Sequence, residues 1–312
     1  MASTASVLHV CPITSPGSQL EVVIQPWLAT LDSEQTRAAY RRAVVVAFKT
    51  MKRTELDRVT PDDVASFKSS QQDKAASTVA LRLAALRSFY GYAVAAGHAK
   101  TDPTKPVKSP KVNPTAPRAL SLAQARKIVA QIDTSDPTGK RDACAVALLF
   151  SGLRVSEVVG LNVGDVRLEE QGGNQFARVH IAHGKGNKAR DVDLPVRAFE
   201  LVQAYLAARP GPREDGLPLF VGNVTGYRVE PGRLTADGLY RQFRRYARRA
   251  GVRISGSHAA RHTWALAAEQ NGAKVADIAA HLGHANLAVT TVYLKRLVGA
   301  RNPASDAVPV LG

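Results

Sequence analysis

The sequence predicts a mainly helical protein of two domains, the second of which carries a small antiparallel β-sheet. The chain has 312 residues, 45% of them hydrophobic, which suffices for two packed cores. Apolar residues recur every three or four positions through most of the chain, as in amphipathic helices. Glycines on both sides of Lys185 mark a tight hairpin, so strands are expected within 165–194. A proline-rich stretch at 101–118 separates the two domains.

The first domain is expected to span 20–100 and to be entirely helical, after a flexible arm at 1–19 that is rich in Ser, Thr and Pro. Asp32 can cap a helix, because apolar residues follow it at helical spacing. Thr60 is a second capping residue, and the proline and two acids after it suit the first turn of a helix. Gly97 follows a long apolar repeat and is expected to end the last helix.

The second domain is expected to span 119–298, followed by a tail at 299–312. Ser121 and Gln124 have the spacing of a capping box at the start of its first helix. The apolar run 143–150 predicts a buried helix. Three strands are expected next, at 165–168, 176–182 and 188–194. Helices are expected to return after Pro195, among them 239–250, 257–270, 274–282 and a short segment at 288–297.

The charge balance indicates a polyanionic partner. Lys and Arg number 42 against 26 Asp and Glu, which gives a formal net charge of +16. No window has the roughly 18–20 uncharged apolar residues of a membrane span, and the N-terminus does not have the pattern of a secretory signal. Cys11 and Cys144 are the only cysteines, which excludes a disulfide scaffold and fits a reducing compartment. We therefore expect a cytoplasmic, nucleoid-associated protein.

Two basic segments could contact phosphates. The linker at 101–118 contributes Lys105, Lys108, Lys111 and Arg118. Its proline density favours an extended connector, which is either a solvated linker or a strap across a phosphate backbone. The helix at 239–250 contributes Arg241, Arg244, Arg245 and Arg248. Because these arginines cover more than one helical face, phosphate contact and a merely solvated surface both remain open.

The candidate functional residues are basic and phenolic, since nucleotide-binding loops and paired C-x-x-C motifs are absent. Arg154 lies between a buried helix and a capped one, and Glu157 three residues later can hold it by an ion pair. An ordinary structural salt bridge is the alternative. His258 and Arg261, also three apart, share a helical face and could present a titratable group and a permanent cation to one phosphate.

The C-terminal histidines raise the question of a metal site. His281 and His284 flank the end of one helix, and with His258 and His262 they offer spacings that zinc can use. Arg261 stands directly beside His262, however, and a guanidinium disfavours a divalent cation nearby. We therefore expect no metal and no cofactor.

In sequence order, the candidate residues Arg154, Lys185, His258, Arg261, His284 and Tyr293 strongly resemble the catalytic set of the tyrosine recombinase (phage-integrase-like) family. Four motifs carry the resemblance: SGLRVSEVVGL from 151, HGKGNKARDVDLP from 183, SHAARHTWA from 257 and LGHANLAVTTVY from 282. The resemblance covers residues 20–298 and is closest to Xer-type and related plasmid or transposon recombinases. It implies a C-shaped clamp of two domains around DNA, with 20–100 as a SAM-like core-binding domain.

The resemblance implies a role for each matching residue. Tyr293 would be the nucleophile that forms a 3′-phosphotyrosine, and Arg154, Arg261 and His284 would stabilise the negative charge of the transition state. His258 would accept the tyrosine proton, and Lys185, or failing it Lys188, would protonate the leaving oxygen. Glu157 would orient the site.

The resemblance also implies partners and a reaction course. Recombination would proceed through a Holliday junction on a double-stranded DNA site, by a homo-tetramer built as a dimer of dimers, with neither metal nor ATP. An accessory protein or partner recombinase could take part, and no membrane is involved. The alternatives are a type IB topoisomerase-like nicking and relaxing enzyme and a non-catalytic DNA-binding protein of the same fold.

Overall fold

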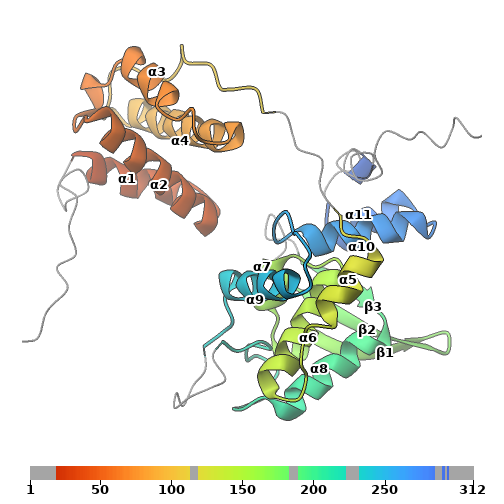
Figure 1. Cartoon of the computed structure of the whole chain (residues 1–312). Helices are drawn as coiled ribbons and strands as arrows, with labels where there is room; N and C mark the ends of the chain where they lie inside the picture. The colour runs from red at the N-terminus through yellow and green to blue at the C-terminus, as the bar shows by residue number, and fades with distance from the viewer. Residues whose placement is uncertain are drawn as a thin grey trace, which may run out of the picture. The chain divides into compact units, whose positions relative to one another are not determined.

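The computed structural model describes residues 19–112, 119–182, 189–222, 232–284, 290–291 and 294. The chain divides into two compact units, Met1–Pro114 and Thr115–Gly312. The described residues confirm the expected class of a mainly helical protein with a small antiparallel sheet (Figure 1). No helix among them is long and apolar enough to cross a membrane.

Helices are the only regular elements in the described part of the first unit. Its elements are α1 (Gln19–Ala29), α2 (Glu34–Met51), the 3-10 helix Leu56–Arg58, α3 (Pro61–Ser69) and α4 (Ala76–Ala95). Aromatic rings form the centre of its core, where Trp27 meets Phe89 edge-on at 5.2 Å between ring centroids. Thr60 caps α3 as predicted, and it forms a capping box with Asp63.

The cap of α2 differs from the prediction. Ser33, rather than Asp32, has the extended backbone of a capping residue, and its hydroxyl accepts a hydrogen bond from the Thr36 amide. Both residues are good caps, so the choice between neighbours depends on the turn that precedes the helix and not on residue type.

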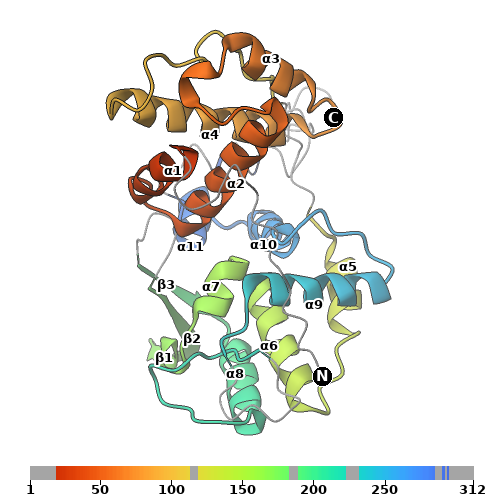
Figure 2. The same cartoon turned by 90° about the vertical axis from the view of Figure 1, so that its left-hand side faces the viewer.

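The second unit combines helices with the sheet. Its helices are α5 (Leu122–Val129), α6 (Pro137–Phe150), α7 (Val155–Gly160), α8 (Val196–Ala208), α9 (Ala236–Arg249), α10 (Ala259–Gln270) and α11 (Val275–Leu282), with a 3-10 turn at Val163–Asp165. The predicted capping box of Ser121 and Gln124 is present at the start of α5. Helix α8 packs on the sheet and on α6, as Figures 1 and 2 show.

Three strands form the sheet, in the order β1 (Val166–Gln171), β2 (Asn174–Ile181) and β3 (Arg190–Leu194), and both pairs are antiparallel. Val179 and Val192 are paired and point into the core, whereas the alternate residues carry charged side chains. The predicted first strand was too short. Gly172 and Gly173 both have positive φ and form a two-residue turn, so β1 and β2 stay paired up to that turn.

Candidate active site

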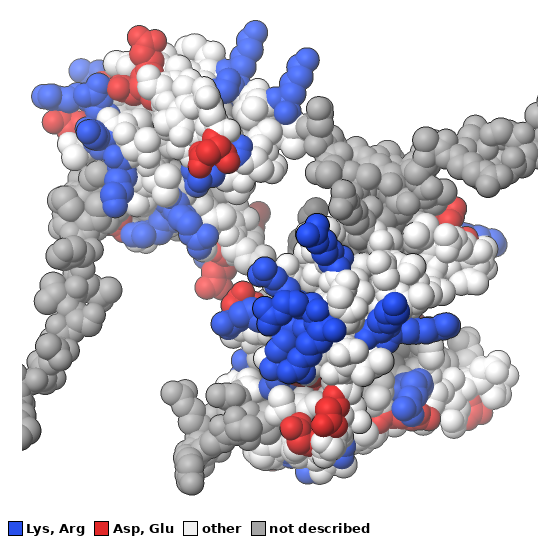
Figure 3. All heavy atoms as spheres, in the orientation of Figure 1, with Lys and Arg blue, Asp and Glu red and all other residues white. Residues whose placement is uncertain are grey.

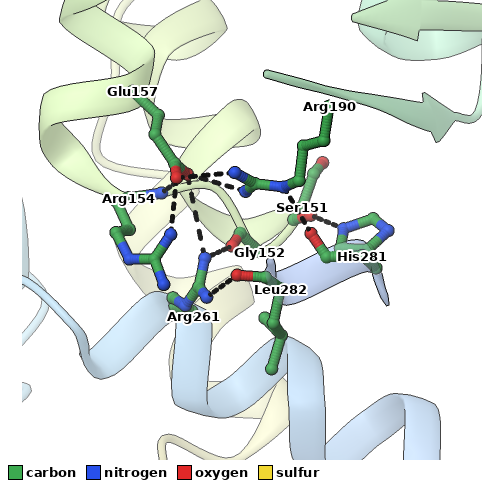
Figure 4. A network of polar contacts seen from close by, with 8 residues as sticks. All are labelled: Ser151, Gly152, Arg154, Glu157, Arg190, Arg261, His281 and Leu282. Carbon is green, nitrogen blue, oxygen red and sulfur yellow. Dashed lines mark hydrogen bonds and ion pairs between the residues drawn. The ribbon is translucent and has the colours of Figure 1, made fainter. Parts of the chain in front are cut away.

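Three of the predicted residues, Arg154, Glu157 and Arg261, meet where α7, β3, α10 and the end of α11 come together (Figure 4). Arg154 is the residue before α7, and Arg261 lies on the first turn of α10. Gly152 has φ +90°, and a β-carbon there would lie 2.9 Å from the Trp264 ring. A glycine is therefore needed for the chain to turn into α7 at this point.

Glu157 is the centre of the site. Its side chain is only 2% exposed, and it accepts hydrogen bonds from the Arg154 amide (2.8 Å) and from Nη1 of Arg154 (2.6 Å). Nη1 and Nη2 of Arg190 reach its two oxygens at 2.9 and 3.0 Å. Burial alone would raise the pKa of this carboxyl, but the bonds from Arg190 and Arg154 and their charges lower the pKa to about 2. Glu157 is therefore ionised at neutral pH.

Arg261 is the most buried cation of the site, with 4% of its side chain exposed. Its Nη1 donates to the Gly152 carbonyl at 2.7 Å and lies 3.8 Å from Oε2 of Glu157. Its Nη2 donates to the Leu282 carbonyl at the end of α11. These contacts join α10, α11 and the turn before α7, and they bring Arg261 and Arg154 to the same carboxylate.

His258 is solvent-exposed and precedes α10 by one residue. Desolvation, together with the charges of Arg261 and Arg154, lowers the pKa of His258 below its usual value. The imidazole is therefore mostly neutral at pH 7 and able to accept a proton. His284 follows α11, and its Nδ1 lies 2.8 Å from the Thr290 hydroxyl.

His281 packs between α10 and the turn before α7. Its ring stacks on Trp264 at 3.8 Å, and Nε2 lies 2.7 Å from the Ser151 carbonyl. Because a carbonyl only accepts, Nε2 carries the proton. Burial, with the charges of Arg261 and Arg190, lowers the pKa of His281 to about 4. Among the described residues, no three His, Cys, Asp or Glu side chains are grouped to hold a metal ion.

The structure thus brings together Arg154, Glu157 and Arg261, with His258 one helical turn from Arg261. Four predicted residues lie outside the described part of the chain: Lys185, Lys188, Tyr293 and Arg118. Sequence reasoning missed Arg190. The alternation of side chains along β3 could have indicated it, because Arg190 lies on the same inward face as Val192 and Leu194. An arginine on that face needs a buried partner.

The predicted DNA-contact residues in the described regions are accessible, with one exception. Lys105, Lys108 and Lys111 are exposed, as are Arg241, Arg244 and Arg248 on α9. Basic side chains gather over the face of the second unit that carries α9 (Figure 3). Arg245 is half-buried, with its guanidinium carbon 5.1 Å from the Tyr246 ring and a nitrogen 3.9 Å from Asp142.

Comparisons with known proteins agree on one family. The Phage integrase family matches residues 118–298, and the N-terminal SAM-like domain of phage integrases matches 24–97. Tyrosine recombinase XerC of Thermodesulfovibrio yellowstonii is 34% identical over 281 residues, which cover 86% of this chain and 89% of that protein. Tyrosine recombinase XerD of Listeria innocua is 30% identical over 245 residues, covering 77% of this chain and 79% of the relative.

Solved structures show the same fold. A lambda integrase tetramer bound to a Holliday junction has a TM-score of 0.70 at 15% identity, covering 91% of this chain and 78% of that one. XerH recombinase bound to its difH substrate before cleavage has a TM-score of 0.66 at 22% identity, covering 97% of this chain and 85% of that one.

Proposed function

Because the chain belongs to the phage integrase family of tyrosine recombinases, which are enzymes that transfer DNA strands, we propose that it performs site-specific recombination through a covalent 3′-phosphotyrosine intermediate and a Holliday junction. Tyr293 attacks the phosphodiester and displaces the 5′-oxygen. The tyrosyl ester retains the bond energy, so the reverse attack by a 5′-hydroxyl rejoins DNA without ATP.

One observation carries the proposal: two arginines gather around one buried, ionised carboxylate and form a cationic cluster. Arg154 and Arg261 share Glu157, yet among the described residues Arg154 uses only Nη1 and its main-chain amide for that contact. The Nε and Nη2 groups of Arg154 can therefore donate to non-bridging phosphate oxygens. Such preorganised donors stabilise the charge that grows on phosphorus-bound oxygens in the transition state.

The remaining roles follow from the chemistry of each group. A tyrosine with pKa near 10 is protonated at neutral pH, and the neutral imidazole of His258 can accept its proton. Lys185 is assigned as the acid that protonates the leaving 5′-oxygen, and His284 as a further donor to the phosphate. The guanidinium groups supply the positive charge that Mg²⁺ supplies in other phosphoryl transfers, so we expect the reaction to need no metal.

The rest of the chain is assigned to binding and assembly. Residues 20–100 form a core-binding domain, 101–118 a basic connector, 119–298 the catalytic domain and 299–312 a tail, after an N-terminal arm at 1–19. The active assembly is a homo-tetramer on two double-stranded sites, with an accessory or partner recombinase as an option. The lambda integrase tetramer on a Holliday junction, which shares the fold, supports this assignment.

Covalent trapping tests the proposal directly. Nicked duplexes carrying randomised and gene-flanking sequences are incubated with the protein in EDTA, and protein-linked DNA is recovered under denaturing conditions and sequenced. The wild type is expected to yield a 3′-linked adduct, and Tyr293→Phe none. Tyr92→Phe is the matched control, because Tyr92 is a half-buried tyrosine of the first unit, and it should trap DNA as the wild type does.

Each other outcome identifies an alternative. Tight specific binding by both wild type and Tyr293→Phe, with no adduct from either, would indicate a non-catalytic binder. An adduct that relaxes supercoiled DNA but never exchanges strands between two sites would indicate a topoisomerase-like enzyme. An adduct that requires a divalent cation would contradict the metal-independent step.

A further inference from the structure

We propose that Arg190 is a positioning residue for DNA strand cleavage, which fixes Glu157 and the end of α11 to strand β3. The inference rests on the proposed function, and it assigns a role to a residue outside the set of six that the sequence indicated. The hydrogen bonds that Arg190 makes among the described residues go to Glu157 and to the His281 carbonyl, which are not groups that the proposed function assigns to the reaction itself. Arg190 acts through these contacts.

Arg190 makes three hydrogen bonds to two elements of the site (Figure 4). Its Nη1 and Nη2 form a two-pronged ion pair with the carboxylate of Glu157 on α7, at 2.9 and 3.0 Å. Its Nε donates to the His281 carbonyl in the last turn of α11, at 3.1 Å. The side chain is 13% exposed, so these contacts are largely shielded from water. A planar guanidinium suits this position, because two of its nitrogens match the carboxylate in fork geometry while Nε is left to donate to the carbonyl.

The ion pair with Arg190 determines the geometry of the contact between Glu157 and Arg154. A carboxylate held by two nitrogens of Arg190 cannot rotate to form a second two-pronged pair. Arg154 consequently contacts Glu157 through one side-chain nitrogen, and Arg261 Nη1 stays 3.8 Å away. Without Arg190, the carboxylate can turn to pair with Arg154 or Arg261 in fork geometry. Either pairing would withdraw donors that the transition state needs.

The contact with α11 fixes the other side of the site. The last carbonyls of a helix lack partners within it, and here the His281 carbonyl is bound by Arg190 and the Leu282 carbonyl by Arg261. Gly283 follows with φ +61°, and a β-carbon at this position would lie 3.0 Å from Cζ, Nε and Nη1 of Arg190. The main chain therefore passes close to the guanidinium just before His284. We infer that Arg190 fixes the position of the His284 backbone.

Single-turnover cleavage of a nicked duplex measures this role, with DNA affinity and Tm measured on the same full-length proteins. Arg190→Gln is expected to slow cleavage by about 10²-fold, the typical loss for a small misplacement of catalytic groups. DNA affinity should stay unchanged. Arg190→Lys, which keeps the charge but reaches one carboxylate oxygen, should recover part of the rate. Arg178→Gln is the matched control: Arg178 lies on β2 and pairs with Glu169 and Asp193, away from the site.

A double-variant cycle separates positioning from a general structural effect. If Arg190 acts mainly through Glu157, the variant Arg190→Gln/Glu157→Gln should be slower than the slower single variant by no more than about twofold. Multiplicative losses would overturn the inference, and so would wild-type cleavage by Arg190→Gln. Equal losses of Tm, affinity and rate in both Arg190→Gln and Arg190→Lys would also overturn it. Failure of the wild type to form any adduct would instead refute the proposed function.

Discussion

Buried arginines serve two purposes in the second unit, and Arg261 and Arg209 illustrate them. Both side chains are almost fully buried and both donate to main-chain carbonyls: Arg261 to Gly152 and Leu282, Arg209 to Pro212, Pro218 and Leu219. Of the two, only Arg261 forms an ion pair among the described residues, at 3.8 Å from the ionised Glu157, and it lies one helical turn from the neutral His258. Hydrogen bonds to main-chain carbonyls alone therefore indicate a structural arginine, whereas the neighbouring carboxylate and histidine indicate a catalytic one.

The same substitution should therefore have different effects at these two arginines. Arg261→Lys should slow single-turnover cleavage by about 10²–10³-fold, as expected for the loss of one preorganised donor to the transition state. Lysine has a point charge and cannot bond both carbonyls while facing a phosphate. Arg209→Lys should lower Tm yet leave the rate at saturating DNA unchanged. A rate loss of the same size in both variants would contradict a catalytic role for Arg261.

His281 predicts a pH dependence of stability. Its pKa is about 4 in the folded protein and near 6.5 in the unfolded chain, so the unfolded state binds more protons between these values. The free energy of unfolding must therefore fall as the pH drops from 6.5 towards 4. Below pH 4.5, protonation of Glu157, whose folded pKa is about 2, adds a second loss.

Urea unfolding at several pH values tests this dependence. His281→Gln can still donate to the Ser151 carbonyl but does not titrate. It should lower the slope of unfolding free energy against pH, between 4 and 6.5, by up to about 1.4 kcal/mol per pH unit, the effect of one proton. An unchanged slope would mean that other groups, such as His262 with its pKa of about 4, carry the dependence.

The geometry at the end of α11 predicts that a substitution there lowers both stability and activity, whereas the matching substitution after α10 lowers stability alone. Gly283 and Gly272 both follow a helix with positive φ, at +61° and +82°. The left-handed backbone should make alanine destabilising by about 1–2 kcal/mol at either position. Only at Gly283 would the new methyl group meet Arg190, since nothing lies within 4 Å of the corresponding atom at Gly272. Gly283→Ala alone should therefore slow cleavage, and comparable rates for the two variants would contradict this.

Local interactions account for what the sequence could predict. The cap at Thr60, the capping box of Ser121 with Gln124 and the pair of Arg154 with Glu157 each join residues no more than three positions apart, so the local sequence alone indicated them. The end of β1 depended on the positive φ of Gly172 and Gly173 and on pairing with β2, while the charged residues of β1 gave no apolar signal.

Contacts between residues that are distant in sequence account for the features that the sequence could not predict. Arg190 is 33 residues from Glu157 and 91 from His281, and its role depends on the register that turns it inward on β3. The stacking of His281 on Trp264 likewise requires α10 and α11 to be packed together. The family resemblance indicated which residues react, but not which residues hold them in place.

The net charge of +16 predicts contacts with DNA phosphates, and two basic segments among the described residues can be tested for them. One is the exposed arginine series of α9, over which cations gather in Figure 3. The other is the described part of the linker, where Lys105, Lys108 and Lys111 are all exposed. A solvated linker and a DNA-contacting strap differ in one measurable quantity, the number of counterions released on binding.

The dependence of DNA affinity on salt concentration distinguishes them. If Lys105, Lys108 and Lys111 each contact a phosphate, replacing all three by Gln should reduce the slope of log affinity against log salt by up to about 2.7, or ~0.9 per contact. The matched control removes the same charge from the second unit, outside the linker and α9. It replaces three exposed arginines by Gln: Arg167, Arg197 and Arg213. Both variants lose long-range attraction, but only direct contacts change the slope by this amount. Equal slopes in the two triple variants would show that the linker lysines are solvated in the complex, and α9 would then be the surface to test next.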